Sequence, residues 1–164
     1  MSSIEIRNAT IEDAPELLSI LTYYIKNTTA SFEINVPTLE EKLRDWFPRN
    51  PKTLIVATIS KKIIGFAMLN KYRQQSGYDL TREVSVWVNC NNLGVGVGDL
   101  LLKQLVVNAK EEGCLCLVAV LCKTNVKSER LFLRNNFYKA AEVDKIAVKF
   151  GRELGILIYQ LVID

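Results

Sequence analysis

Three alternate glycines stand between a strand pattern and a helix pattern, and this unit constrains the fold more than any other part of the chain. Residues 82–88 alternate in polarity, as a half-buried strand does. Gly94, Gly96 and Gly98 follow, and apolar residues then recur every three or four positions over residues 99–113. Such a turn can point several backbone N–H groups at one spot, where the helix dipole favours negative charge. The unit therefore predicts either a phosphate-binding turn or a purely structural link from strand to helix.

Two common nucleotide-binding motifs do not fit these glycines. The dinucleotide pattern GxGxxG would place its third glycine one position beyond Gly98, and the acidic residue expected ~20 positions later falls in the apolar segment from Cys114. The Walker pattern GxxxxGK[ST] would need a lysine where Asp99 stands. The sequence therefore argues against a nicotinamide cofactor and against nucleotide hydrolysis.

The chain contains no histidine, which removes several kinds of catalytic site. Ser-His-Asp and Cys-His hydrolysis are excluded, so a general base must be Glu, Asp, Lys or Tyr. The mixed Cys/His zinc sites are excluded as well, and no CxxC pair is present, so no metal site is expected. We expect four free and mainly buried thiols, at Cys90, Cys114, Cys116 and Cys122.

Composition and charge favour one globular domain. The chain has 164 residues, 49% of them hydrophobic and 24% charged, so we expect a single domain over residues 1–164. The net charge of +3 is scattered along the chain, which does not favour a nucleic-acid partner.

The longest apolar segment, residues 114–122, is too short to span a membrane as a helix. The N-terminus lacks a secretory pattern, so we expect a cytoplasmic protein.

The other periodic segments predict a layered α/β fold. The expected order is β-α-α-β-β-β-α-β-α-β-β. Gly65 is expected to mark a β-bulge, and Thr10 with Asp13 is expected to cap the first helix. The expected elements are a strand at 4–9, a helix that follows the box at 10–13 and stops before 27, a helix from 38 to before 48, strands at 53–59, 63–72 and 82–88, a helix at 99–113, a strand at 114–121, a helix after 125, and strands at 146–149 and 156–162.

The segment from Val86 to Leu102 resembles the acetyl-CoA loop of the GNAT superfamily of N-acetyltransferases. The resemblance extends over residues 4–162 and is nearest to phosphinothricin-type acetyltransferases. It implies a single-domain GNAT-like fold, in which helices flank a central mixed, mostly antiparallel sheet. The features that carry the resemblance are Ile6-Arg7 with Asp13, Thr29-Ala30-Ser31-Phe32-Glu33, Tyr72-Arg73 before Gly77-Tyr78, Glu83-Val84-Ser85-Val86, Asn125 with Ser128, and Lys149-Phe150-Gly151-Arg152.

The resemblance implies that an amine attacks the thioester of acetyl-CoA directly. The amine must first lose the proton that an ammonium with a pKa near ~10 holds at neutral pH. Glu83 stands at the family position of the general base, and the alternative is a solvated residue paired with Arg82 or Arg73. The residues implied to bind acetyl-CoA are Val86, Trp87 and Val88 along the pantetheine, Leu93, Gly94, Val95, Gly96, Val97, Gly98 and Asp99 at the pyrophosphate, and Asn125 and Ser128 beyond them. Asn125 could instead be only a helix cap.

Three positions depart from the family pattern. Leu93 and Val95 stand where the loop often carries polar or basic side chains, so the pyrophosphate would meet backbone donors alone. Phe132 stands where relatives have a tyrosine or histidine that protonates the leaving thiolate. A thiol with a pKa not far above ~8.5 can leave as the thiolate or take a proton from water.

The resemblance also implies a small, amino-acid-like amine as the acceptor. Arg73 could grip a carboxylate or phosphinate through a bidentate pair. The alternative for Phe32 and Tyr72 is packing in the core or at its rim. The residues implied at the acceptor cleft are Phe32, Glu33, Tyr72, Arg73 and Tyr78.

Other functions fit the same residues. The chain could be a sensor that binds acetyl-CoA without catalysis, a peptide or protein N-acetyltransferase, or an interaction module without a ligand. A cleft closed by residues 28–33 would favour a small acceptor, and an open groove would favour a polypeptide. The family is often dimeric, and the apolar strand at 156–162 could bury itself either against a second copy or in the core of its own chain.

Overall fold

A computed structural model describes residues 2–164 and contains one seven-stranded sheet. The spatial order is β1-β2-β3-β4-β5-β7-β6, and the only parallel pair in this order is β4 with β5. The predicted fold class, a mixed and mostly antiparallel sheet flanked by helices, is therefore confirmed. The strands are β1 (Glu5–Asn8), β2 (Leu54–Ile59), β3 (Lys62–Lys71), β4 (Thr81–Val88), β5 (Cys116–Cys122), β6 (Tyr138–Lys149) and β7 (Arg152–Val162).

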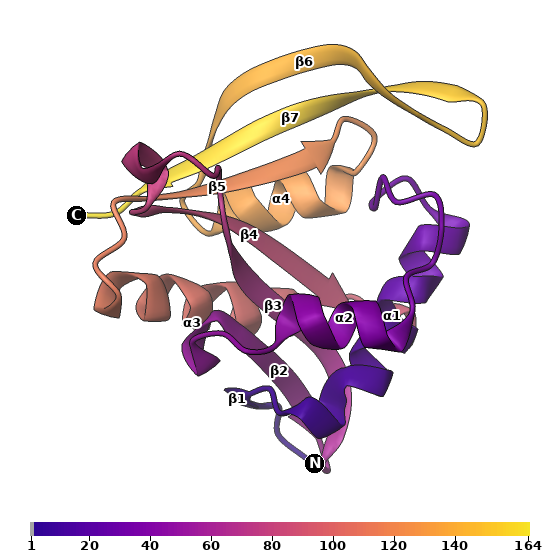
Figure 1. The fold of residues 1–164 in the computed structure, drawn as a ribbon, viewed down its shortest axis with the longest axis vertical. Coiled ribbons are helices and arrows are strands. Elements are labelled where there is room, and N and C mark those ends of the chain that lie inside the picture. Colours follow the sequence, from indigo (N-terminus) through magenta and orange to yellow (C-terminus); the bar gives the residue numbers. More distant parts are fainter. Residues whose placement is uncertain (1) are drawn as a thin grey trace.

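Helices cover both faces of the sheet (Figure 1). The helices are α1 (Ala14–Asn27), α2 (Leu39–Trp46), α3 (Val97–Glu111) and α4 (Val126–Arg134). Side chains of α3 and α4 share one buried cluster with β2 to β5, whereas α1 and α2 form a second cluster with β2 and β3. Alternate residues of the same strands supply the two clusters, as Ile55 and Val56 do, because successive side chains of a strand point to opposite faces. No helix within residues 2–164 is long and apolar enough to cross a membrane.

The predicted first residues of the two C-terminal strands are wrong, whereas their predicted last residues, 149 and 162, agree with the structure. β6 begins at Tyr138 rather than at 146, and β7 begins at Arg152 rather than at 156. β6 is an edge strand that is mostly exposed, so its first half lacks the apolar alternation used to predict strands. Its pairing with β7 also shifts register twice, which breaks the period further. Both strands form the long hairpin in Figure 1.

The apolar strand predicted at 156–162 packs in the core of its own chain. β7 lies inside the sheet and pairs with β5 on one edge and β6 on the other. Ile156, Leu157 and Tyr159 are buried within the chain itself. The four cysteines are free thiols, as predicted, although only Cys114 and Cys122 are buried.

Gly65 lets the start of α3 approach the sheet closely. The register of β2 and β3 shifts between Ala57 and Thr58, opposite Gly65, so the predicted bulge is confirmed. A Cβ atom at Gly65 would lie 3.0 Å from Trp87 O and 3.0 Å from Val97 Cγ1. Because any larger residue would push against these atoms, Gly65 sets how near the first turn of α3 lies to β4.

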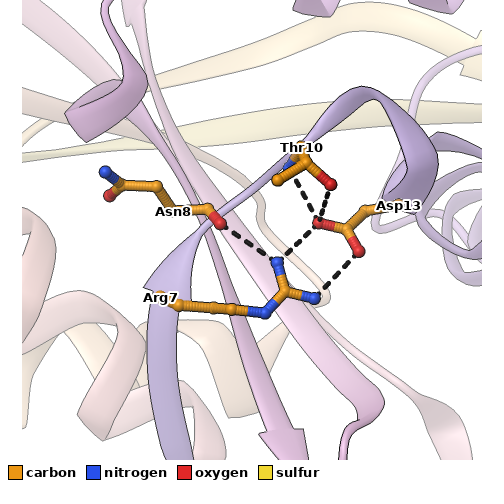
Figure 2. Close-up of polar contacts among 4 residues, drawn as sticks. All are labelled: Arg7, Asn8, Thr10 and Asp13. Carbon is orange, nitrogen blue, oxygen red and sulfur yellow. Dashed lines mark hydrogen bonds and ion pairs between the residues drawn. The ribbon is translucent and has the colours of Figure 1, made fainter.

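An ion pair fixes the start of the first helix (Figure 2). The Arg7 guanidinium binds both oxygens of Asp13, at 2.7 and 2.9 Å, and the Thr10 backbone N–H donates to the same carboxylate at 2.8 Å. The predicted capping box of Thr10 with Asp13 is therefore present, and the Thr10 hydroxyl also contacts the Asp13 carboxylate. The hydrogen bond from Arg7 lowers the pKa of the buried Asp13 carboxyl.

We expect Asp13→Asn to lower the free energy of unfolding by about 2 kcal/mol at pH 7, because a charged pair with a buried acceptor is lost. The folded pKa of Asp13 lies below its unfolded value, so this stabilisation is present above the unfolded pKa and is lost as pH falls through the folded pKa. Urea titrations at pH 7 and pH 3 measure the difference between wild type and variant. Glu12→Gln, at an exposed neighbour, is the control, and an equal loss in both variants would contradict the assignment.

Candidate active site

A groove of about 830 Å³ opens where β4 and β5 separate. Their pairing ends at Glu83 with Val118, and the two strands diverge beyond that point (Figure 1). The backbone groups of β4 that face this opening have no strand partner there. The walls of the groove are the end of β4, the glycine turn with the start of α3, the start of α4, and the end of α1 with the residues after it.

The glycine turn presents backbone donors to this groove. Gly94 and Gly96 have φ angles of 78° and 86°, which a residue with a side chain rarely adopts. No atom lies within 4 Å of where a Cβ would stand at either residue, so the space in front of the turn is open. Gly96 precedes α3, whose first N–H groups have no acceptor within the helix. The turn can therefore receive a phosphate or pyrophosphate.

The groove brings together nearly all of the residues predicted to bind the cofactor. Val95 is the exception, because it is 58% exposed and does not line the groove. Asn125 caps α4, since its side-chain oxygen accepts from Ser128 N at 3.2 Å. The predicted residues in the lining are Val86, Trp87, Val88, Leu93, Gly94, Gly96, Val97, Gly98, Asp99, Asn125 and Ser128.

Aromatic residues of α1 form the wall beside β4. The Tyr24 hydroxyl donates to the carbonyl of Val88, and the Tyr24 ring lies 5.2 Å from that of Trp87. Burial raises the pKa of Tyr24 to about 12, so this side chain stays a hydrogen-bond donor at neutral pH. The indole N–H of Trp87 is buried and has no hydrogen-bond partner within residues 2–164.

The segment 28–33 is tied across the cleft at two points. The Thr29 hydroxyl lies 3.2 Å from that of Thr124, which precedes α4. The Lys149 ammonium at the end of β6 donates to Ser31 O at 2.6 Å and is only 3% exposed. Burial lowers the pKa of Lys149, and the charge of Glu33 opposes this effect. These contacts hold the segment 28–33 against Thr124 and the end of β6, beside the groove.

The residues predicted at the acceptor cleft lie on two segments outside the groove lining. Phe32 and Glu33 belong to the tied segment 28–33. Three others lie together between β3 and β4, where the ring of Tyr72 is 5.5 Å from that of Tyr78 and the Arg73 guanidinium lies 5.1 Å above Tyr72.

Glu83 lies on β4 just where the pairing with β5 ends. Burial raises the pKa of its carboxyl, and the charge of Arg73 partly offsets this rise. The Arg82 side chain instead donates to the carbonyls of Asp79 and Thr81, so the alternative pairing of Glu83 with Arg82 is not formed. A carboxylate with a raised pKa is a stronger base, which suits proton removal from an amine.

Comparison with known proteins decides which family this geometry represents. Residues 18–137 match the acetyltransferase (GNAT) family. The chain belongs to this family. It is 29% identical to the L-methionine sulfoximine/L-methionine sulfone acetyltransferase of Pseudomonas aeruginosa, over 99% of this chain and 96% of that protein. It is 30% identical to the phosphinothricin N-acetyltransferase of Alcaligenes faecalis, over 91% of this chain and 77% of that protein.

The fold agrees with this assignment. The structure of an acetyltransferase from Salmonella typhimurium with its cofactor acetyl-CoA matches at a TM-score of 0.94 and 27% identity, over 98% of this chain and 94% of that one. The GNAT chain described here is therefore an N-acyltransferase, as its sequence predicts. The resemblance to phosphinothricin-type enzymes is confirmed as well.

Sequence reasoning missed several residues of this GNAT groove. Phe132 lies against Phe137 in the core, with 5.0 Å between ring centroids, so it contributes no polar atom to the groove.

The aromatic residues of α1 that line the groove gave only a helical apolar stripe in the sequence, which any packed helix shows. The basic residues of α4 gave a clearer signal, because they recur three and four residues apart directly after the cap at Asn125. The missed lining residues are Tyr23, Tyr24, Thr28, Thr29, Ala30, Asn92, Thr124, Lys127, Arg130, Leu131 and Arg134.

Proposed function

We propose that this GNAT enzyme transfers the acetyl group of acetyl-CoA to the amino group of a small, amino-acid-like molecule. The observation that carries the proposal is the attachment of residues 28–33 beside the groove, where Thr124 and Lys149 hold the segment. A segment held in this position would leave room for a small amine and obstruct a polypeptide. The names of the relatives from Pseudomonas aeruginosa and Alcaligenes faecalis support the same acceptor class.

The groove suits acetyl-CoA as the donor. The pyrophosphate would meet the backbone N–H groups at Gly94, Gly96 and the start of α3, where no side chain fills the space. The pantetheine would lie along β4 from Val86 to Val88, in the gap left by β5. Backbone N–H groups of this strand would also stabilise the oxyanion that forms on the acetyl carbonyl.

Glu83 is the proposed general base for the acceptor. It would take the proton of the ammonium, directly or through a water molecule, and the free amine would attack the thioester carbonyl. The attack forms the C–N bond, and the C–S bond breaks as the tetrahedral adduct collapses. The nitrogen then releases its surplus proton, which water carries to the departing coenzyme A thiolate. A thiol pKa near ~8.5 permits this departure without a side-chain acid in place of Phe132.

Arg73 is the proposed anchor of the acceptor. Its guanidinium is exposed beside Tyr72 and Tyr78, and it can pair with a carboxylate or phosphinate through two hydrogen bonds. Its charge also favours the ionised form of Glu83, because it opposes the rise in pKa that burial causes. Phe32 and Glu33 would close the other side of the bound acceptor.

We expect thiol release from acetyl-CoA with methionine sulfone or methionine sulfoximine as acceptor. The matched negative control is 3-(methylsulfonyl)propylamine, which keeps the amine and the sulfone but lacks the carboxylate. We expect its kcat/KM to be lower by about 100-fold, because a charged bidentate contact is lost. Turnover only with a peptide that begins with a free α-amine would contradict the small-acceptor proposal. Saturable coenzyme A binding without turnover on any amine would favour the sensor.

We also propose that the enzyme acts in the cytoplasm without a metal and as a homodimer. Direct attack on a thioester needs no Lewis acid. The strand expected to meet a second copy, β7, is already paired on both edges, so a partner would contact the exposed strand β6 or a face of the sheet. Sedimentation at several protein concentrations measures the mass in solution.

A further inference from the structure

Three basic residues of α4 form a row along the groove. Lys127, Arg130 and Arg134 all line it, and their spacing of three and four residues places them on one side of the helix. We propose that Lys127 and Arg130 bind phosphate groups of coenzyme A from α4, in place of the basic side chains that the glycine turn lacks. This inference rests on acetyl-CoA being the donor, as proposed above.

The glycine turn leaves a deficit of positive charge. Leu93 and Val95 are apolar, so the turn offers only backbone N–H groups to a ligand that carries a pyrophosphate and a further phosphate. Asp99 adds a negative charge in the first turn of α3, close to where the pyrophosphate would lie. Cations from another element would therefore strengthen the binding of a phosphate at this turn.

Arg134 is occupied with this acidic residue. Its guanidinium binds the Asp99 carboxylate at 2.9 Å, and Asn135 Nδ2 donates to the same carboxylate at 2.9 Å. The hydrogen bond from Arg134 lowers the pKa of Asp99, which keeps the carboxylate ionised and paired. Arg134 thus neutralises Asp99 and has little charge left for a ligand.

Lys127 and Arg130 remain available. Neither residue forms an ion pair within residues 2–164. The acid between them, Glu129, accepts a hydrogen bond from the hydroxyl of Tyr159 on β7. The two cations therefore border the groove without a carboxylate to neutralise them.

The packing of the two helices puts these cations beside the glycine turn. A Cβ atom at Gly98 would lie 3.4 Å from Leu131 Cδ2, so the first turn of α3 rests on the middle of α4. Arg130 is the neighbour of Leu131, and Lys127 lies one helical turn earlier. The backbone donors of the turn and the cations of α4 thus border the same part of the groove.

The test is the affinity for coenzyme A of the double variant Lys127→Gln with Arg130→Gln, measured by intrinsic tryptophan fluorescence and by calorimetry. We expect binding to weaken by about 100-fold, because each cation contributes about tenfold through a charge-assisted contact. Raising the salt concentration should weaken binding to wild type more than to the variant. The control carries the same charge change at two exposed residues away from the groove, Lys62→Gln with Lys110→Gln, and should bind within about twofold of wild type.

Two smaller ligands locate the contact. Pantetheine has no phosphate and should bind the variant and wild type equally. A loss retained with 3′-dephospho-coenzyme A assigns the cations to the pyrophosphate, whereas a loss seen only with coenzyme A assigns them to the 3′-phosphate. The single variant Arg130→Lys keeps a positive charge at this position and should keep most of the affinity for coenzyme A.

Two results would overturn the inference. In one, coenzyme A binds the double variant as tightly as it binds the control. In the other, pantetheine binding falls as much as coenzyme A binding, which would mean that the two residues only maintain the shape of the groove. Failure of wild type to bind coenzyme A at all is a different result, because it would also reject acetyl-CoA as the donor.

Discussion

Glu83→Gln is expected to lower kcat by about 10²- to 10⁴-fold, the usual contribution of a general base. The glutamine amide cannot accept the proton of the ammonium. It has nearly the same size as the glutamate carboxylate, so the packing where the pairing of β4 with β5 ends should be kept. Coenzyme A affinity should stay within about twofold of wild type, because the proposed cofactor contacts lie beyond this position. Thiol release and calorimetry on the same preparations separate catalysis from binding.

The pH profile provides a second readout of the same residue. Because burial raises the pKa of Glu83, the acid limb of kcat/KM in wild type should lie above the ordinary glutamate range. Arg73→Gln should move this limb to higher pH, since a charge that favours the carboxylate is removed. The control Glu5→Gln changes an exposed acid on β1 and should leave rate and profile unchanged. Full turnover in Glu83→Gln would remove Glu83 from the mechanism.

Gly65→Val is expected to lower the free energy of unfolding by about 3 kcal/mol and the melting temperature by about 6–12 °C. Its Cβ would meet Trp87 O and Val97 Cγ1 at 3.0 Å, and the two further methyl groups have no free volume to occupy. The structure can relieve this overlap by moving α3 away from β4, which would also shift the glycine turn. We therefore expect weaker coenzyme A binding together with the lower stability.

Gly77→Val is the matched control for this substitution. A Cβ atom at Gly77 would have no other atom within 4 Å, and this residue lies before β4, outside the groove. The same added volume there should cost less than about 1 kcal/mol. Equal melting temperatures for the two variants would show that the close approach at Gly65 does not limit the position of α3.

Local sequence patterns predicted the parts of this fold that have a clear period. The strand at residues 82–88 and the bulge beside Gly65 follow from alternation and from one glycine. The helix after the glycine turn begins two residues earlier than expected, at Val97, because Gly96 rather than Gly98 ends the turn. The first half of β6 could not be found in this way, because an exposed edge strand needs no apolar face.

The part of the site that is formed by backbone groups of the glycine turn was predictable from the sequence. Alternate glycines before a helix indicated either an anion-binding turn or a structural one, and the structure places these glycines in the lining of the groove. The attachment of the segment 28–33 was not predictable, because it depends on contacts between residues far apart in the sequence. Lys149 reaches Ser31 across 118 positions, and Thr29 reaches Thr124 across 95. No local period carries such information.

The two hydrogen bonds of the segment 28–33 also determine how large a fraction of the molecules has this segment detached. A hydrogen bond from a charged donor and one between two hydroxyls together contribute about 3 kcal/mol, so on the order of one molecule in a hundred would have the segment detached at equilibrium. Loops of this size open and close within microseconds. An amine would therefore enter and its acetylated product would leave through brief openings that recur many times during a single catalytic turnover.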